Sequence, residues 1–150
     1  MQLTRAADYA IRVMIHLAGM PPGKRISRDD LASAAECPEQ FLSKVLQGLT
    51  RAGLVISHRG NVGGFELPDV HLTATVLEVV EAIEGPIRLN ICLMSSQACP
   101  RESWCPAHGI WEDAQAAMTN VLKAATIDEL ARRAAATRAL TELPQAPQWN

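Results

Sequence analysis

The sequence predicts a mainly α-helical protein, built as a winged helix-turn-helix with a long C-terminal dimerisation helix. Two closely joined amphipathic helices are followed directly by a β-hairpin, which is the order of elements in a winged helix-turn-helix. A later helix carries an apolar stripe over about 20 residues, more than the small winged domain can cover. The chain has 150 residues and is 48% hydrophobic but only 4% aromatic, so we expect an aliphatic core.

Side-chain caps mark the starts of the first two predicted helices. Thr4 is placed to cap a first helix that ends near Leu17. Ser27, followed three residues later by Asp30, resembles a capping box and predicts a short helix over residues 28–35.

A third helix and a hairpin complete the winged unit. Pro38 is expected at the first position of this helix, which runs to Arg51 and stops before Gly53. Residues 54–57 are predicted to form a strand and residues 65–67 its return, joined by a glycine-rich turn.

The rest of the chain is predicted from helix periods and breakers. A fourth helix is expected over 74–84, and it closes a DNA-binding domain of residues 1–85 with its wing at 54–67. A loop over 86–104, which carries cysteines and is expected to bind an iron–sulfur cluster as argued below, leads to a region over 105–140. That region consists of a long dimerisation helix, which opens at Cys105-Pro106 and reaches about Ala125, and a final helix capped by Thr126; residues 141–150 are expected to form a disordered tail.

Charge is divided unevenly along the chain. The formal net charge is −2, yet residues 1–66 hold eight Lys and Arg against six Asp and Glu. The remaining residues hold six against ten, so the N-terminal half is the one suited to approach phosphates.

The sequence also predicts where the protein acts. It has no signal peptide and no run of about 18 apolar residues, so we expect a cytoplasmic protein with no membrane partner. Cytoplasmic thiols stay reduced, and the four cysteines therefore point to metal or redox chemistry before disulfides.

The third helix has a polar face that suits contact with base edges and phosphates, although any amphipathic surface helix has a polar face. The order of the elements and the glycine-rich wing favour DNA binding. The predicted DNA contacts are Gln40, Ser43, Lys44 and Gln47 on the helix face, Thr50 and Arg51 near its end, Arg59 at the wing tip, and Arg28, with Arg5, Lys24 and Arg25 as further phosphate contacts.

Three cysteines have the spacing Cys-x6-Cys-x5-Cys at Cys92, Cys99 and Cys105. Structural zinc favours tight Cys-x2-Cys pairs, whereas wide spacing on a loop suits an iron–sulfur cluster held by thiolates. Cys105 is expected at a helix N-terminus, where the helix dipole favours thiolate. A Cys₃His zinc site and three unconnected buried thiols are the alternatives.

Three thiolates leave a fourth ligand position open. His108 is expected one turn into the helix that starts at Cys105. Asp8 on the first helix, which the partner subunit could supply, is the other candidate. An ordinary surface histidine and a first-turn carboxylate are the competing interpretations of these two residues. Cys37, which precedes Pro38, is interpreted as a packing residue.

The same motifs resemble those of the Rrf2 family, which includes the regulators IscR, NsrR and RirA. The resemblance covers roughly residues 1–140. It implies a homodimer with a winged helix-turn-helix, with Cys92, Cys99 and Cys105 as cluster ligands. It also implies two options for the fourth ligand: His108 in a 2Fe–2S branch, or Asp8 supplied across the dimer in a 4Fe–4S branch. The matching stretches are 1–4, 8–12, 53–55, 59–60, 63–65 and 84–86.

The predicted function is that of a dimeric transcription regulator, a repressor, that binds a pseudo-palindromic double-stranded operator. Its DNA affinity would be controlled by an iron–sulfur cluster (4Fe–4S or 2Fe–2S) that senses iron, nitric oxide or redox state. A cluster-free regulator that senses oxidants through its cysteines, and a zinc-stabilised regulator, are the alternatives. An enzyme is not expected, because the sequence has no Cys-x-x-Cys, phosphate-binding loop or paired carboxylate motif.

Overall fold

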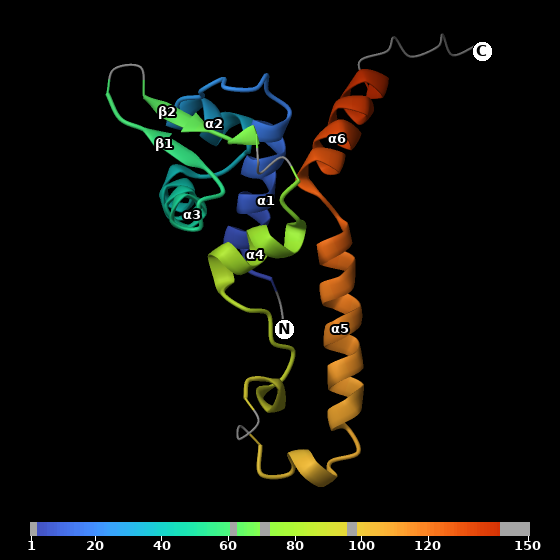
Figure 1. Ribbon diagram of the computed structural model, residues 1–150. Coiled ribbons are helices and arrows are strands. Elements are labelled where there is room, and N and C mark those ends of the chain that lie inside the picture. The colour runs from blue at the N-terminus through green and yellow to red at the C-terminus, as the bar shows by residue number, and fades with distance from the viewer. Residues whose placement is uncertain (1–2, 61–62, 70–72, 96–98, 142–150) are drawn as a thin grey trace, which may run out of the picture.

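The computed structural model describes residues 3–60, 63–69, 73–95 and 99–141, and it confirms a mainly helical winged fold (Figure 1). Helices α1 to α4 and a small hairpin form one body, and α5 extends beside it as a long arm. The elements are α1 (Arg5–Ala18), α2 (Arg28–Ala34), α3 (Glu39–Arg51), β1 (Ile56–His58), β2 (Gly64–Glu66), α4 (Val76–Glu84), the 3-10 turns η2 (Ile91–Leu93) and η3 (Glu102–Trp104), α5 (His108–Ala124) and α6 (Ile127–Thr141).

The predicted caps form at the helix starts. The Thr4 hydroxyl accepts from the Ala7 N–H, and the Ser27 hydroxyl accepts from the Asp30 N–H. Helix α4 begins with a complete capping box between Thr75 and Glu78. These side chains satisfy N–H groups that have no partner within the helix, so each helix start is encoded locally.

Two predicted helix starts are wrong, and a proline lies near each of them. Pro38 caps α3 instead of opening it, with a ψ of 137° that is not helical. The long helix begins at His108, because Cys105 precedes Pro106 and has an extended backbone with a ψ of 115°. A proline sterically disfavours the helical conformation of the residue before it, so Cys105 lies outside the helix.

The wing is an antiparallel hairpin that a third segment joins. Its register pairs Ile56 with Glu66 and His58 with Gly64. Ile26, in the connection between α1 and α2, exchanges two backbone hydrogen bonds with Phe65, of 3.1 and 2.9 Å. The hairpin is therefore anchored to the helical body, one to two residues from the predicted strand positions.

The core is aliphatic, as the composition predicts, and lies where α1, α3 and α4 meet. Ile127 at the start of α6 is fully buried in the same cluster, and α6 packs along α1. Helix α5 has no buried residue in the described structure, and it reaches the core only through half-buried side chains such as Met118 and Leu122. No helix in the described part of the chain is both long and apolar enough to cross a membrane.

Candidate nucleic-acid interface and cysteine site

Helix α3 separates an apolar face from a polar one. Leu42, Val45 and Leu49 are buried in the core. Every predicted contact on the other face is exposed, as are Arg28 and Arg59. The exposed predicted contacts on α3 are Gln40, Ser43, Lys44, Gln47, Thr50 and Arg51.

A cleft of about 480 Å³ lies between α3 and the wing. Five of the predicted contacts line it together with Ser57 and Phe65 of the hairpin, whereas Gln40, Lys44 and Arg59 are exposed outside it. Polar side chains from α2, α3 and β1 thus face one cleft, an arrangement able to bind base edges and phosphates. The five predicted residues in the cleft are Arg28, Ser43, Gln47, Thr50 and Arg51.

Two of these side chains also have partners within the protein. Arg28 forms an ion pair with Glu39 at 3.5 Å, and the Ser43 hydroxyl donates to the Glu39 carbonyl at 3.2 Å. The pair is exposed, so it is weak and can exchange Glu39 for a phosphate.

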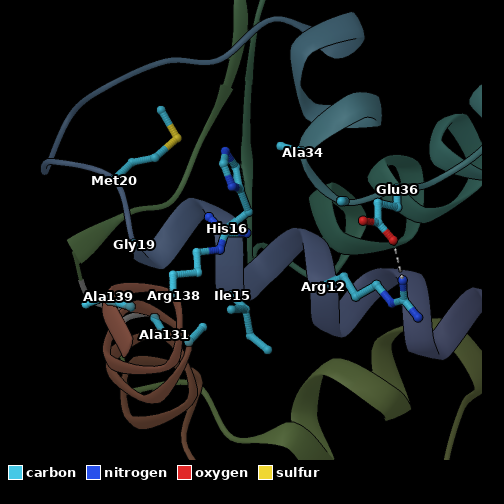
Figure 2. Close-up of a pocket in the computed structure, with 13 residues that line it drawn as sticks. Arg12, Ile15, His16, Gly19, Met20, Ala34, Glu36, Ala131, Arg138 and Ala139 are labelled. Atoms are coloured by element: carbon cyan, nitrogen blue, oxygen red, sulfur yellow. Dashed lines mark ion pairs between the residues drawn. The ribbon is translucent and has the colours of Figure 1, made fainter. Parts of the chain in front are cut away.

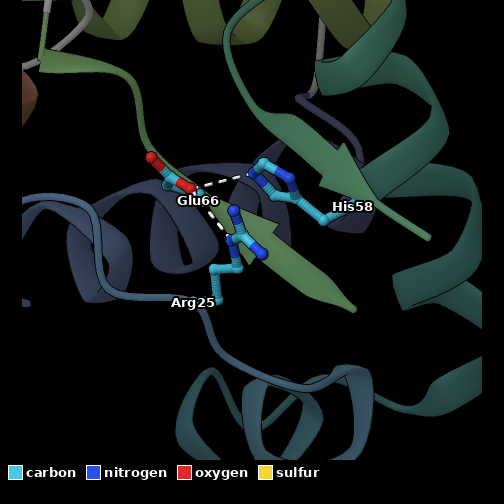
Figure 3. A network of polar contacts seen from close by, with 3 residues as sticks. All are labelled: Arg25, His58 and Glu66. Atoms are coloured by element: carbon cyan, nitrogen blue, oxygen red, sulfur yellow. Dashed lines mark hydrogen bonds and ion pairs between the residues drawn. The ribbon is translucent and has the colours of Figure 1, made fainter. Parts of the chain in front are cut away.

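A carboxylate holds the wing against the helical body (Figure 3). Glu66 on β2 lies 2.8 Å from Nε2 of His58 on β1 and 3.4 Å from Nε of Arg25, in the connection before α2. Arg25, expected at a phosphate, is thus engaged inside the protein. The contact between Glu66 and His58 was not predicted from the sequence. A carboxylate and an imidazole at diagonal positions of two paired strands are the pattern that could have indicated it.

The cysteine loop folds around a cavity of about 290 Å³. Cys92, Cys99 and Cys105 all line it, although they lie in different turns of the loop, and His108 at the start of α5 lines it as well. All three thiols are free and half-buried. The other lining residues are Asn90, Ile91, Pro100, Glu102 and Trp111.

The polar atoms of this cavity are incompletely satisfied. Nδ1 of His108 and one carboxylate oxygen of Glu102 are buried without a hydrogen-bond partner in the described structure. Buried polar atoms rarely stay unpaired, so such a pair beside three thiols fits a site that takes a further group. Within the described ranges, no three His, Cys, Asp or Glu side chains are arranged to hold a single metal ion.

The remaining candidates lie elsewhere. Asp8 on α1 is exposed and forms an ion pair with Arg12 at 3.0 Å, and it does not line the cysteine cavity of its own chain. Cys37 is 4% exposed, and its thiol donates to the Pro38 carbonyl. Burial raises the pKa of the Cys37 thiol, an effect that Arg12 partly offsets, so Cys37 behaves as a packing residue.

The winged body, the cysteine loop and α3, which is called the reading helix below because its polar face suits contact with DNA, can be compared with known proteins. A family model described as "Rrf2: Iron-dependent Transcriptional regulator" matches residues 3–133. Protein aau3 of Rhizobium meliloti is 35% identical over 134 residues, covering 88% of this chain and 86% of the relative. The HTH-type transcriptional regulator NsrR of Shouchella clausii is 29% identical, covering 99% of this chain and 100% of the relative.

Solved structures have the same fold. CymR, described as the global cysteine regulator of B. subtilis, superposes with a TM-score of 0.70 and 26% identity, over 89% of this chain and 98% of that one. IscR of T. potens superposes with a TM-score of 0.67 and 21% identity, over 97% and 94% of the two chains, which shows the fold alone. Members of this family are transcriptional regulators and not enzymes. The chain belongs to the Rrf2 family of transcriptional regulators.

Proposed function

We propose that this regulator is a homodimeric repressor of a pseudo-palindromic operator, and that an iron–sulfur cluster on Cys92, Cys99 and Cys105 controls its affinity for DNA. One observation carries the proposal: these three cysteines line a single cavity. Thiolates are the usual ligands of such clusters, and a bound cluster would supply a centre reactive toward nitric oxide, oxidants or iron loss. The cluster type, 4Fe–4S or 2Fe–2S, depends on the fourth ligand.

Two side chains compete for that fourth position. His108 is supported by its place in the cavity and by its buried Nδ1, which has no partner in the described structure. Asp8 would have to come from the partner subunit, and its exposed carboxylate would have to leave Arg12. Exposed ion pairs are weak, so such an exchange costs little.

Hydrogen bonds offer a route from the cysteine loop to the reading helix. The Leu89 N–H donates to Oε1 of Gln115, which ties the loop to α5 at 3.1 Å. At the other end of α5, the Ala125 carbonyl accepts from the Val76 N–H at 2.9 Å, which ties α5 to the start of α4.

Helix α4 in turn contacts the reading helix closely. A Cβ atom placed on Gly48 of α3 would lie 2.8 Å from Cδ1 of Ile83 on α4, so the Ile83 side chain packs directly against the α3 backbone. We propose that a change in the cysteine loop moves α3 through α5 and α4, as a two-state shift of packed helices.

Helix α5 supports the homodimer. Ile110, Ala114, Ala117 and Val121 share one face of the helix and are all exposed, with Ile110 and Val121 more than 60% accessible. A second copy would bury this apolar stripe and place two reading helices about one DNA turn apart.

Anaerobic native mass spectrometry tests the cluster. We expect a dimer carrying iron and sulfide, lost when Cys92, Cys99 or Cys105 is changed to Ala but kept in a Cys37→Ala control. Protein folding should survive the three loop substitutions, because those thiols are half-buried and lie outside the core cluster. A colourless protein with stoichiometric zinc contradicts the proposal.

The same measurement on His108→Ala and Asp8→Ala identifies the fourth ligand. The substitution that lowers the cluster content or its lifetime removes the ligand, and the other leaves both unchanged. If neither has an effect, a different group fills the fourth position.

Thiol oxidation without a cluster is a second candidate function, supported by the three free, half-buried cysteines around one cavity and by the fold shared with CymR. A disulfide between two of them would form by loss of two electrons and two protons to an oxidant such as peroxide. Non-reducing mass analysis of cluster-free protein after peroxide treatment separates this function from the first. A loss of two mass units at these cysteines, with altered DNA affinity, supports it.

A further inference from the structure

A further cavity shares no lining residue with the cysteine loop or with the cleft between α3 and the wing. It encloses about 640 Å³ between α1, the end of α2 and α6 (Figure 2). This volume is in the range of small-molecule sites, which run from about 300 to 1,000 Å³. Neither the proposed cluster nor the reading helix uses it.

One wall of this cavity is apolar and made of small side chains. Helix α6 contributes a row of alanine methyl groups, at positions 131, 134, 135 and 139. Ile15 on α1 and Met20, which follows the α1 cap, add apolar side chains to the lining. Such a surface suits the aliphatic body of a small organic molecule.

The charged groups of the cavity are mostly cationic. Arg138 on α6 reaches toward His16 on α1, and Arg12 lies at the other end beside Glu36 (Figure 2). Arg12 is already paired, with Asp8 at 3.0 Å and with Glu36 at 3.7 Å. Arg138 makes no ion pair with another residue in the described part of the chain, so its guanidinium can accept an anion from outside.

We propose that this cavity binds a small organic anion, with its carboxylate against Arg138 and His16 and its aliphatic body against the alanine face of α6. Arginine presents a planar pair of donors that matches a carboxylate, and the imidazole adds a further N–H. Burial and the nearby Arg138 lower the pKa of His16, consistent with a position where positive charge has no compensating anion. The ligand would join α6 to α1, the helix that also packs against α3.

Calorimetric titration with sodium hexanoate tests the site on the full chain. We expect saturable binding, with hexanamide at least tenfold weaker because the neutral amide cannot form a charge-assisted bond to Arg138. Inorganic phosphate should compete at least tenfold less well than hexanoate, because it has no aliphatic body. Phosphate that displaces hexanoate equally well would mean that the cavity takes any anion, and would overturn the proposal.

Substitutions on α6 provide the matched controls. Arg138→Gln should weaken hexanoate at least tenfold, whereas Arg133→Gln, on the same helix but paired with Glu129 and outside the cavity, should leave affinity unchanged. Ala134→Phe fills the cavity without removing charge and should also abolish binding, with circular dichroism confirming its fold. Absence of saturable binding up to about 20 mM hexanoate, or equal losses in Arg138→Gln and Arg133→Gln, refutes the site.

Discussion

At the scale of single residues, Gly64 shows how closely the wing is fitted to the body. Its φ is +147°, and a Cβ atom there would lie 2.5 Å from the backbone oxygen of Ile26. That oxygen accepts the 2.9 Å hydrogen bond from Phe65 that anchors the hairpin. Residues other than glycine rarely adopt this backbone conformation, and the backbone oxygen of Ile26 cannot move aside as the end of a flexible side chain could.

Gly64→Ala should therefore lower the free energy of unfolding by about 1–3 kcal/mol, the usual range for a strained backbone position. Urea denaturation followed by circular dichroism measures the change. Gly109→Ala is the control, because nothing lies within 4 Å of its Cβ position and alanine suits a helix better than glycine. Equal stability of wild type and Gly64→Ala would show that the wing backbone can shift to accommodate a Cβ atom at position 64, which contradicts the prediction.

His16 predicts a pH dependence of stability. Its pKa in the folded protein is lowered from 6.5 by burial and then by Arg138, while in the unfolded chain it stays near 6.5. Below pH 6.5 the unfolded state binds the proton more readily, so stability is highest above this pH and falls as the pH drops toward the folded pKa.

The difference in unfolding free energy between wild type and His16→Gln isolates this contribution, because other histidines titrate in both proteins. We expect wild type to lose stability relative to His16→Gln between about pH 7 and pH 5. A difference that does not change with pH would contradict a lowered His16 pKa.

At the scale of elements, α5 is the helix that the described chain leaves least covered. It has 17 residues, none of them buried, and its stripe through Ala114 and Ala117 faces solvent. A helix that packs on its own core buries one face fully, so this exposure favours a second copy as the covering surface.

Ala117→Asp should weaken dimerisation at least tenfold, because it buries an unpaired carboxylate in the proposed interface. Ala116→Asp makes the same chemical change one residue away, on an exposed position off the stripe, and should leave the dimer intact. Analytical ultracentrifugation over a range of protein concentrations compares the two. Equal weakening by both variants would place the interface elsewhere.

At the scale of the whole molecule, the proposed DNA binding would draw on the reading helix, the wing and the dimer together. Arg59 follows β1 and is exposed outside the cleft, where it can reach a minor groove or phosphate beyond the bases contacted by α3. Its contribution depends on the wing being held by the Glu66 contacts.

Arg59→Ala should weaken binding to an operator selected from random double-stranded DNA by about 1–3 kcal/mol, or roughly 5- to 150-fold. Fluorescence anisotropy at fixed salt measures the affinity, and repeating it over a salt series shows whether a phosphate contact is lost. Arg132→Ala, on α6 and paired with Asp128, is the control. Unchanged affinity of Arg59→Ala would place the wing away from DNA.

The helical body and its order were predictable because their signals are local. Thr4, Ser27 and Thr126 each accept a hydrogen bond from an N–H three residues ahead, and the buried faces follow the helical period. The exposed face of α3 is the complement of its buried face, so the predicted contact residues are all exposed. Local rules were enough to predict the winged fold that the relatives share.

Only the tertiary structure decided which distant side chains meet. The spacing of Cys92, Cys99 and Cys105 indicated a ligand set. The loop that carries them has no helical or strand periodicity, so the sequence could not predict that they line one cavity with His108 and Glu102. The Glu66 contacts and the cavity beside Arg138 join segments far apart in sequence, and they exist only after the helices pack. The sequence alone determined the elements and their polar faces, because hydrogen bonds and periodicity act over a few residues. Packing decided the sites, because proximity in a folded chain is set by the core that the elements share.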